Sequence, residues 1–229
     1  MPRPMPIETE NGRLPVLPLA RGDLDEVFAL YSLVLASSPR GALDERDRAE
    51  FAALLEDRNT IAVGLRAGSM LVGYAFYILA GELPAPNRAF LDRFGAGGQA
   101  AVLSRGIAVH PDYRQSDIGS ALIAHQRAIL AMRGIEHAFN VVLHANWPAI
   151  PLRLRSGGVF PGHITDRYGL CFLAYTGPLT PRFSRNVSAQ VEVAHADIAA
   201  QEKLFARGFA VTACGERDGV RRLLFAPPV

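Results

Sequence analysis

The hydrophobic positions of the chain change period several times, and each change predicts the end of one element and the start of the next. After a short strand interrupted by Pro15 and Pro18, a spacing of three and four residues predicts a helix, and a second helix is expected from about Asp44. Two strands, over 60–65 and 70–79, follow and are joined by a turn typical of a hairpin. The apolar face of the first helix is expected to consist of Leu24, Val27, Phe28, Tyr31 and Leu35.

The most distinctive pattern lies within residues 102–132 and predicts a strand, a tight loop and a helix. Ile107 and Val109 alternate with smaller neighbours, and Pro111 ends the strand because it has no amide to donate. The helix then carries one apolar face. Between them, residues 114–120 place backbone N–H groups at a helix N-terminus beside an arginine, an arrangement that binds anions.

Strands at 138–143, 159–164 and 170–175 surround a short helix that opens near Asn146. The segment 142–149 aligns with 193–200 at an offset of 51 residues, and a strand, a helix and a hairpin are again predicted after the second copy. Two interpretations remain open: a repeat of half a domain, or a chance match of short alanine-rich stretches.

Residues 114–119 read Arg-Gln-Ser-Asp-Ile-Gly and follow a strand that ends Val-His-Pro. This resembles the pyrophosphate loop of the Gcn5-related N-acetyltransferases (GNAT), Arg/Gln-x-x-Gly-x-Gly/Ala, with Asp117 at the first glycine. The resemblance implies an α/β (α+β) fold with a mixed, mostly antiparallel central sheet flanked by helices. It also implies acetyl-CoA, or another acyl-CoA, as co-substrate.

A second part of the family pattern, Asn-x-x-Ala-x-x-Leu-Tyr-x-x-x-Gly-Phe, is similar to the stretch from Asn146 to Gly157. Arg153 stands at the tyrosine, and an alignment shifted by one residue places Leu154 there instead. In the family this tyrosine commonly protonates the departing thiolate. Neither alignment therefore provides the usual general acid.

The resemblance also implies which residues form the site. The backbone N–H of Val109 is expected to stabilise the thioester oxygen in the transition state. His144 and Tyr168 are candidates for proton transfer, the alternatives being a hydrogen-bonded residue at a strand end and a residue of the cleft wall. The expected cofactor-binding residues are Ile107, Ala108, Val109, Arg114, Gln115, Ser116, Asp117, Ile118, Gly119, Ser120, Asn146 and Arg153.

Composition narrows the class of protein. The chain has 229 residues, of which 49% are hydrophobic and 20% charged, and its net charge is +2 without a block of like charges. We therefore expect a globular protein that binds neither nucleic acid nor membrane and resides in the cytoplasm. Cys171 and Cys214 are far apart, so neither a metal site nor a disulfide is predicted.

These observations predict a flexible arm over 1–12, a GNAT-like acyl-CoA-binding domain over 13–179, and a strand-helix-hairpin extension over 186–229. The expected activity is transfer of an acetyl group from acetyl-CoA to an amine by direct attack. The acceptor would be a small-molecule or peptide amine. The alternative is a non-catalytic acyl-CoA-binding or dimerisation module, and the extension is a candidate homodimer contact.

Overall fold

The computed structural model describes residues 7–9, 12–38, 43, 45–96, 98–114, 117–166, 169–183 and 189–229. Its elements form two units. Unit 1 comprises residues 1–80 and 102–134, and unit 2 comprises residues 81–101 and 135–229. The boundary thus falls inside the expected domain 13–179, and unit 2 contains the whole expected extension.

Unit 1 contains strands in the order β6-β5-β4-β3 and a separate pair, β1-β2. The pair aligns Ile7 with Leu14, so the segment expected as an arm contains a short strand. The elements are β1 (Ile7–Thr9), β2 (Gly12–Leu14), β3 (Val16–Pro18), α1 (Leu24–Ala36), α2 (Arg48–Glu56), β4 (Thr60–Ala67), β5 (Met70–Ala80), β6 (Ala101–Val109) and α4 (Ile118–Met132).

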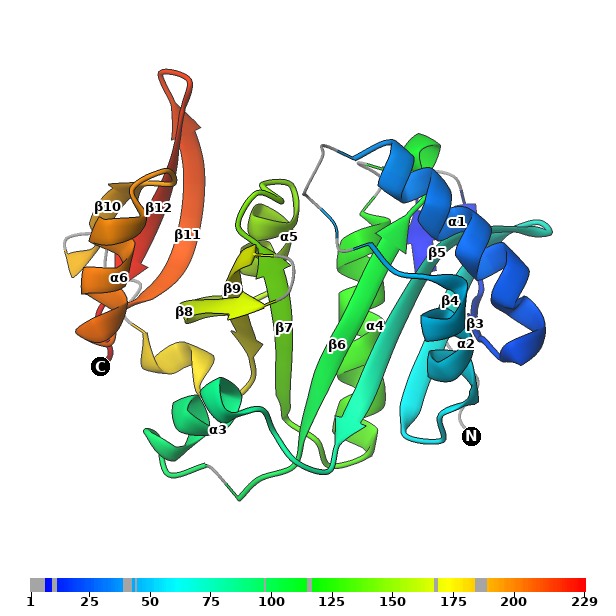
Figure 1. Ribbon diagram of the computed structural model, residues 1–229, viewed down its shortest axis with the longest axis horizontal. Helices are drawn as coiled ribbons and strands as arrows, with labels where there is room; N and C mark the ends of the chain where they lie inside the picture. Colours follow the sequence, from blue (N-terminus) through cyan, green and yellow to red (C-terminus); the bar gives the residue numbers. More distant parts are fainter. Residues whose placement is uncertain are drawn as a thin grey trace. The chain divides into compact units, whose positions relative to one another are not determined.

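Helices cover both faces of the unit 1 strands (Figure 1). On one face, α1 and α2 enclose an aromatic core in which the Phe51 ring lies 4.9 Å from Tyr31 and 6.1 Å from Tyr74. On the other face, α4 approaches Gly73 so closely that a β-carbon there would lie 3.4 Å from Ile118. The helix of the predicted strand-loop-helix, α4, therefore packs closely against β5.

The second helix begins at Arg48, four residues later than the expected start near Asp44. A capping box explains the difference. The Asp47 side chain accepts from the Glu50 N–H at 2.8 Å, and the Glu50 carboxylate accepts from the Asp47 N–H at 3.2 Å. These two bonds satisfy amides that the first helical turn leaves without partners.

The described residues of unit 2 form six strands in the order β10-β12-β11-β8-β9-β7. The strand pairs recorded within this unit are antiparallel. The elements are α3 (Ala85–Asp92), β7 (His137–Leu143), α5 (Ala149–Arg155), β8 (Val159–Asp166), β9 (Gly169–Thr176), β10 (Val191–Ala194), α6 (Ile198–Ala206), β11 (Ala210–Arg217) and β12 (Val220–Ala226).

The structure of unit 2 repeats after 51 residues. This shift carries both ends of β8 onto β11, the start of β9 onto the start of β12, and the ends of β7 and α5 onto the ends of β10 and α6. The glycines after the two helices, Gly157 and Gly208, have φ angles of 82° and 83°. We call β7-α5-β8-β9 the first repeat and β10-α6-β11-β12 the second. Conformation therefore supports the repeat interpretation over a chance match.

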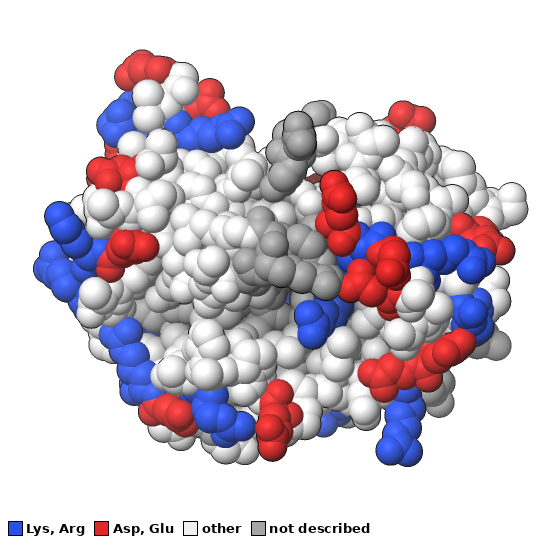
Figure 2. Space-filling view, viewed as in Figure 1, with Lys and Arg blue, Asp and Glu red and all other residues white. Residues whose placement is uncertain are grey.

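Both repeats contribute to one core. Phe160 and Phe172 of the first repeat lie in the same buried cluster as Val211, Leu223 and Phe225 of the second, and all five are fully buried. An apolar cluster shared in this way binds the two repeats together by the hydrophobic effect. The chain exposes acidic and basic side chains that are intermixed on the face shown in Figure 2.

Candidate active site

The end of β6 orients the backbone groups that precede the loop. The N–H of His110 donates to Val72 O of β5 at 2.9 Å. Because successive amides of a strand point to opposite edges, the N–H of Val109 points away from β5. Pro111 then begins a short 3-10 turn, Pro111–Tyr113, as the proline predicts.

Asp117 is the residue at which the loop turns into α4. Its φ is 56° and its ψ is 7°, which is left-handed backbone, and its O accepts from the Ala121 N–H at 2.9 Å. This conformation is strained for residues with a β-carbon, although Asp and Asn tolerate it best among them. The conformation explains why the family pattern has glycine here. The Asp117 side chain makes no capping hydrogen bond.

The other loop residues differ in whether a side chain or a backbone amide is available to a ligand. Arg114 donates from Nη2 to Ser37 Oγ at 2.8 Å, which ties the loop to the end of α1. The Ile118 side chain is buried, so only its backbone can face a ligand. Gly119 and Ser120 lie in the first turn of α4, where amides lack intrahelical partners. Two expected residues, Gln115 and Ser116, lie outside the described residues.

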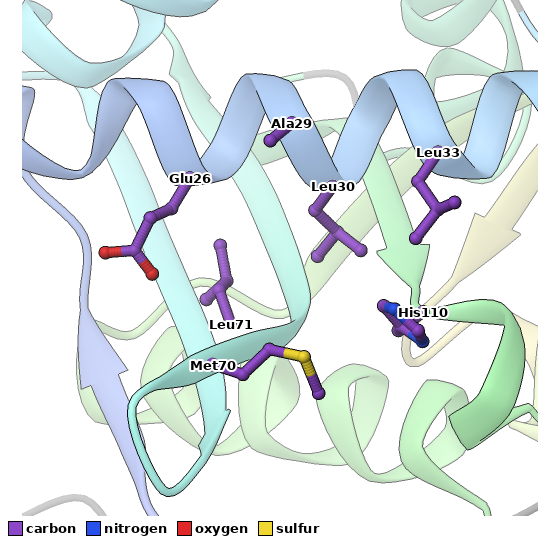
Figure 3. Close-up of a pocket in the computed structure, with 7 residues that line it drawn as sticks. All are labelled: Glu26, Ala29, Leu30, Leu33, Met70, Leu71 and His110. Atoms are coloured by element: carbon purple, nitrogen blue, oxygen red, sulfur yellow. The ribbon is translucent and has the colours of Figure 1, made fainter.

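A pocket of about 240 Å³ lies beside the start of the loop (Figure 3). His110, which directly follows β6, closes one end of it, and Glu26 of α1 lies at the other. The Glu26 carboxylate is bound to Arg66 Nη1 at 2.6 Å, which leaves the pocket largely apolar. The remaining lining residues are Ala29, Leu30, Leu33, Met70 and Leu71. None of the expected site residues lines this pocket.

In unit 2, the expected site residues lie around the turn from β7 into α5. The Asn146 N–H donates to Leu143 O at 2.8 Å, and its O accepts from the Ala149 N–H at 3.1 Å, so its backbone forms the turn. Arg153 lies on α5, and its O accepts from the Gly158 N–H at 3.0 Å. Tyr168 lies outside the described residues.

His144 follows β7 directly and belongs to a cluster of three histidines. Its ring stacks on His195 with centroids 4.0 Å apart and planes at 14°, and lies 5.8 Å from the His163 ring. Phe172 packs against His144 and His163 at 5.0 and 4.8 Å. Nε2 of His144, Nε2 of His195 and both ring nitrogens of His163 have no hydrogen-bond partner among the described residues.

Burial lowers the pKa of His144, and it lowers the pKa of His163 and of His195 to about 4. The proximity of His144 lowers the pKa of the other two rings further. The Gln201 amide raises the pKa of His144 and of His163 and so offsets part of the shift. At neutral pH the three half-buried rings are therefore uncharged.

The sequence pattern marks His144 as a candidate but gives no signal for His163 or Gln201. His195 entered only through the alignment of the two copies. Within the described residues, no group of three or more His, Cys, Asp or Glu side chains is arranged to hold a metal ion. No helix in the described part of the chain is long and apolar enough to cross a bilayer.

Comparison with known proteins identifies the class. Residues 27–157, more than half of the chain, match the family model "Acetyltransferase (GNAT) family". The chain therefore belongs to the GNAT acetyltransferases, and the expected family and fold class are confirmed. No curated protein shows a significant sequence match.

Many solved structures share the fold at low identity. NAA60 of Arabidopsis thaliana in complex with acetyl-CoA has a TM-score of 0.60 and 14% identity, covering 72% of this chain and 98% of that one. The PaiA N-acetyltransferase of Thermoplasma acidophilum in complex with coenzyme A has a TM-score of 0.54 and 14% identity, with the same coverage. The ribosomal-protein-S18-alanine N-acetyltransferase of Escherichia coli has a TM-score of 0.52 and 17% identity, covering 76% and 98%.

Proposed function

We propose that the protein is an N-acyltransferase that transfers an acetyl group from acetyl-CoA to a small-molecule or peptide amine by direct attack. The observation that carries this proposal is the left-handed turn at Asp117, which begins α4 directly after the loop that contains Arg114. The backbone there has the conformation that the family pattern assigns to glycine. Its helix N-terminus offers amides to the pyrophosphate of acetyl-CoA.

The reaction follows from this placement. The neutral amine attacks the thioester carbonyl and forms a carbon–nitrogen bond as the carbon–sulfur bond breaks. The nitrogen loses a proton to give the amide, and coenzyme A leaves as a thiolate that gains a proton. In this proposal the Val109 N–H, which points away from β5, stabilises the carbonyl oxygen as it becomes negative. Arg114 and the α4 amides, all of unit 1, hold the pyrophosphate of the donor, and this positioning supplies much of the rate enhancement.

His144 and Tyr168 are the proposed proton carriers, and the surroundings of His144 suggest how to test its role. Replacing His144 by Phe keeps an aromatic ring against His195 and Phe172. If His144 moves a proton, His144→Phe abolishes thiol release while the unfolding midpoint stays near that of the parent protein. If the ring is only structural, the turnover number is unchanged.

Binding of acetyl-CoA is tested by thermal unfolding with increasing ligand. A ligand at 100 times its dissociation constant stabilises the folded state by about 3 kcal/mol. Asp117→Gly removes a carboxylate from the phosphate-binding loop, and we expect roughly tenfold tighter binding of acetyl-CoA. It should also relieve about 1 kcal/mol of backbone strain.

Asp218→Gly is the matched control, because Asp218 has a φ of 54° and lies in the β11–β12 turn of unit 2. It should relieve similar strain and leave the affinity for acetyl-CoA unchanged. No stabilisation by millimolar acetyl-CoA in the parent protein would contradict the proposal.

A second candidate function is acyl-CoA binding without turnover. One observation favours it: α5 carries Arg153 and the buried Leu154 where the family pattern has tyrosine, so neither alignment gives a hydroxyl. A thiol-release assay over a panel of amines separates the two functions. Acetyl-CoA that stabilises the protein but releases no thiol with any amine would favour the binding module.

A further inference from the structure

The two repeats of unit 2 meet through equivalent residues. The central strands β8 and β11 pair antiparallel with Phe160 opposite Val211, and these residues are 51 positions apart. His144 stacks on His195, which is also 51 positions away. A residue that contacts its own equivalent lies on a two-fold axis, so the contact has the form of a symmetric homodimer interface.

The strand order shows the same symmetry over the whole unit. Exchanging the repeats converts β7, β9 and β8 into β10, β12 and β11, and the order β10-β12-β11-β8-β9-β7 is then unchanged when read from the other end. One polypeptide therefore contains the strand order that two identical subunits would produce by pairing through β8.

We propose that the second repeat is a tethered substitute for a second copy of this chain. It covers what we call the β8 surface, defined as β8 with Phe160 and His163 together with the ring of His144. The β8 surface is self-complementary, and a second copy of the first repeat occupies it when the second repeat is displaced. The expected homodimer contact thereby moves from residues 186–229 to the first repeat.

Two properties of the β8 surface make it a pairing surface. The strand β8 would be an open edge without β11, and such edges recruit another strand. The three named side chains carry no charge at neutral pH, because Phe160 is apolar and fully buried and burial lowers the pKa of His144 and of His163. A second copy would therefore meet no charge of like sign on these three side chains at neutral pH.

The covalent link explains why the second repeat, and not a second copy of the chain, pairs with β8 in the intact protein. A partner joined by a short linker has an effective concentration in the millimolar range, which exceeds ordinary protein concentrations. The fit is also better, because Phe160 faces the smaller Val211 rather than a second phenylalanine on the axis. Pairing between chains is thus expected only after the second repeat has been displaced.

The test displaces the second repeat within the full chain. Val211→Pro removes a backbone amide from β11 opposite Phe160, which a paired strand does not tolerate. Val211→Ala keeps the amide and serves as the control. Hydrogen exchange over 159–166, measured at low and high protein concentration, reports coverage of β8, and sedimentation equilibrium reports mass. Protection of β4 and β5 in the same experiment shows that unit 1 remains folded.

We expect Val211→Pro to expose the β8 amides at low concentration and to protect them again at high concentration, as dimers form. The parent protein and Val211→Ala should keep the β8 amides protected at every concentration. A Val211→Pro chain that stays monomeric with exposed β8 amides would overturn the proposal, as would one that assembles beyond dimers. A monomer in which β8 stays protected both in Val211→Pro and in the second variant described next would also overturn it.

If β8 stays protected in Val211→Pro, a second substitution that displaces the second repeat shows whether that repeat covers β8. Phe205→Asp places a carboxylate on α6, where the ring now lies 4.8 Å from His163 and 5.1 Å from Phe225. Lys203→Asp, on the exposed side of α6, is its control. Phe205→Asp should give the same concentration-dependent protection of β8 as Val211→Pro. Protection that is independent of concentration in both variants shows that something other than the second repeat covers β8.

Discussion

The two repeats share one backbone plan but begin their helices differently. In the first repeat, Pro148 precedes the seven-residue α5. In the second, Asp197 caps the nine-residue α6 by accepting from the Ala200 N–H at 3.0 Å. Both helices end at a left-handed glycine. The comparison teaches that the glycine belongs to the fold itself, whereas the residues at the helix start can change between copies.

The interiors of the repeats also differ at equivalent positions. Ile150 and Gln201 are both fully buried and lie 51 residues apart, yet one is apolar and the other is an amide. His163 of β8 corresponds to Cys214 of β11. The polar groups of the shared core are therefore distributed unequally. Each difference can be removed by one substitution that makes the copies alike.

The largest expected effect comes from removing an equivalent buried side chain in each copy. Phe172 and Leu223 are 51 residues apart and fully buried in the shared cluster. We expect Phe172→Ala to lower the free energy of unfolding by about 3–5 kcal/mol and Leu223→Ala by about 2–5 kcal/mol. Fluorescence of Trp147, whose ring lies 5.0 Å from His195, follows the transition in urea.

Because the two side chains share one core, both substitutions should shift the Trp147 transition. The exposed Val141, replaced by Ala, is a control that should change it by less than about 0.5 kcal/mol. If Leu223→Ala left the Trp147 transition unmoved, the repeats would unfold separately, and the shared core would not couple them.

The next effect is a loss of stability in acid. Burial lowers the pKa of His163 and of His195 to about 4, from 6.5 in the unfolded chain. As the pH falls below 6.5, the unfolded chain binds protons that the folded protein does not. Stability should therefore decline between pH 6.5 and about 4, by at most about 1.4 kcal/mol per pH unit for each histidine.

His163→Cys makes this position like its equivalent, Cys214, whose thiol pKa is raised by burial and which stays neutral throughout this range. Urea titrations of the parent and the variant at several pH values measure the slope. The variant should lose the contribution of one histidine. An unchanged slope would show that His163 gains its proton in the folded state as readily as in the unfolded chain.

Much of the fold was predictable because its signals are local. The strands expected at 159–164 and 170–175 are observed at Val159–Asp166 and Gly169–Thr176, because alternation of side chains and turn residues act over a few positions. The left-handed turn at Asp117 was visible as a glycine position of a motif. Local signals thus carried both the elements and the loop.

The histidine cluster was not predictable in the same way. His144, His163 and His195 converge only after two copies fold against each other, and no spacing along the chain indicates that contact. The direction of the Val109 amide likewise depends on which strand pairs with β6. Side-chain environments that depend on distant pairing need the structure.

A smaller effect is expected from the buried amide of the second repeat. Gln201 Nε2 donates to His195 O at 2.7 Å and to Ala194 O at 3.2 Å, where β10 ends. Gln201→Ile makes this position like Ile150 and leaves these carbonyls without that donor. We expect a loss of about 1–3 kcal/mol in urea denaturation. The control Ile150→Val deletes only a methylene group at the equivalent position. A gain in stability for Gln201→Ile would contradict the expectation.

The smallest expected effect is a difference in stability between alanine substitutions at the glycines that follow α5 and α6. After α5, the Gly157 N–H donates to Leu154 O at 3.1 Å, and after α6 the Gly208 N–H donates to Phe205 O at 2.8 Å. Alanine at either glycine adopts left-handed backbone at a cost of about 1–2 kcal/mol. A β-carbon at Gly208 would also overlap the Arg93 guanidinium, which donates to Gly208 O at 3.3 Å.

Gly208→Ala should therefore cost about 1 kcal/mol more than Gly157→Ala in thermal or urea unfolding. In an Arg93→Ala background the overlap is gone, and the two alanine substitutions should cost the same. A difference that survives the removal of Arg93 would place its cause in the helix end itself rather than in the side chain packed against it. Equal costs in the parent background would show that Arg93 moves aside without loss, so that the two helix ends are energetically equivalent.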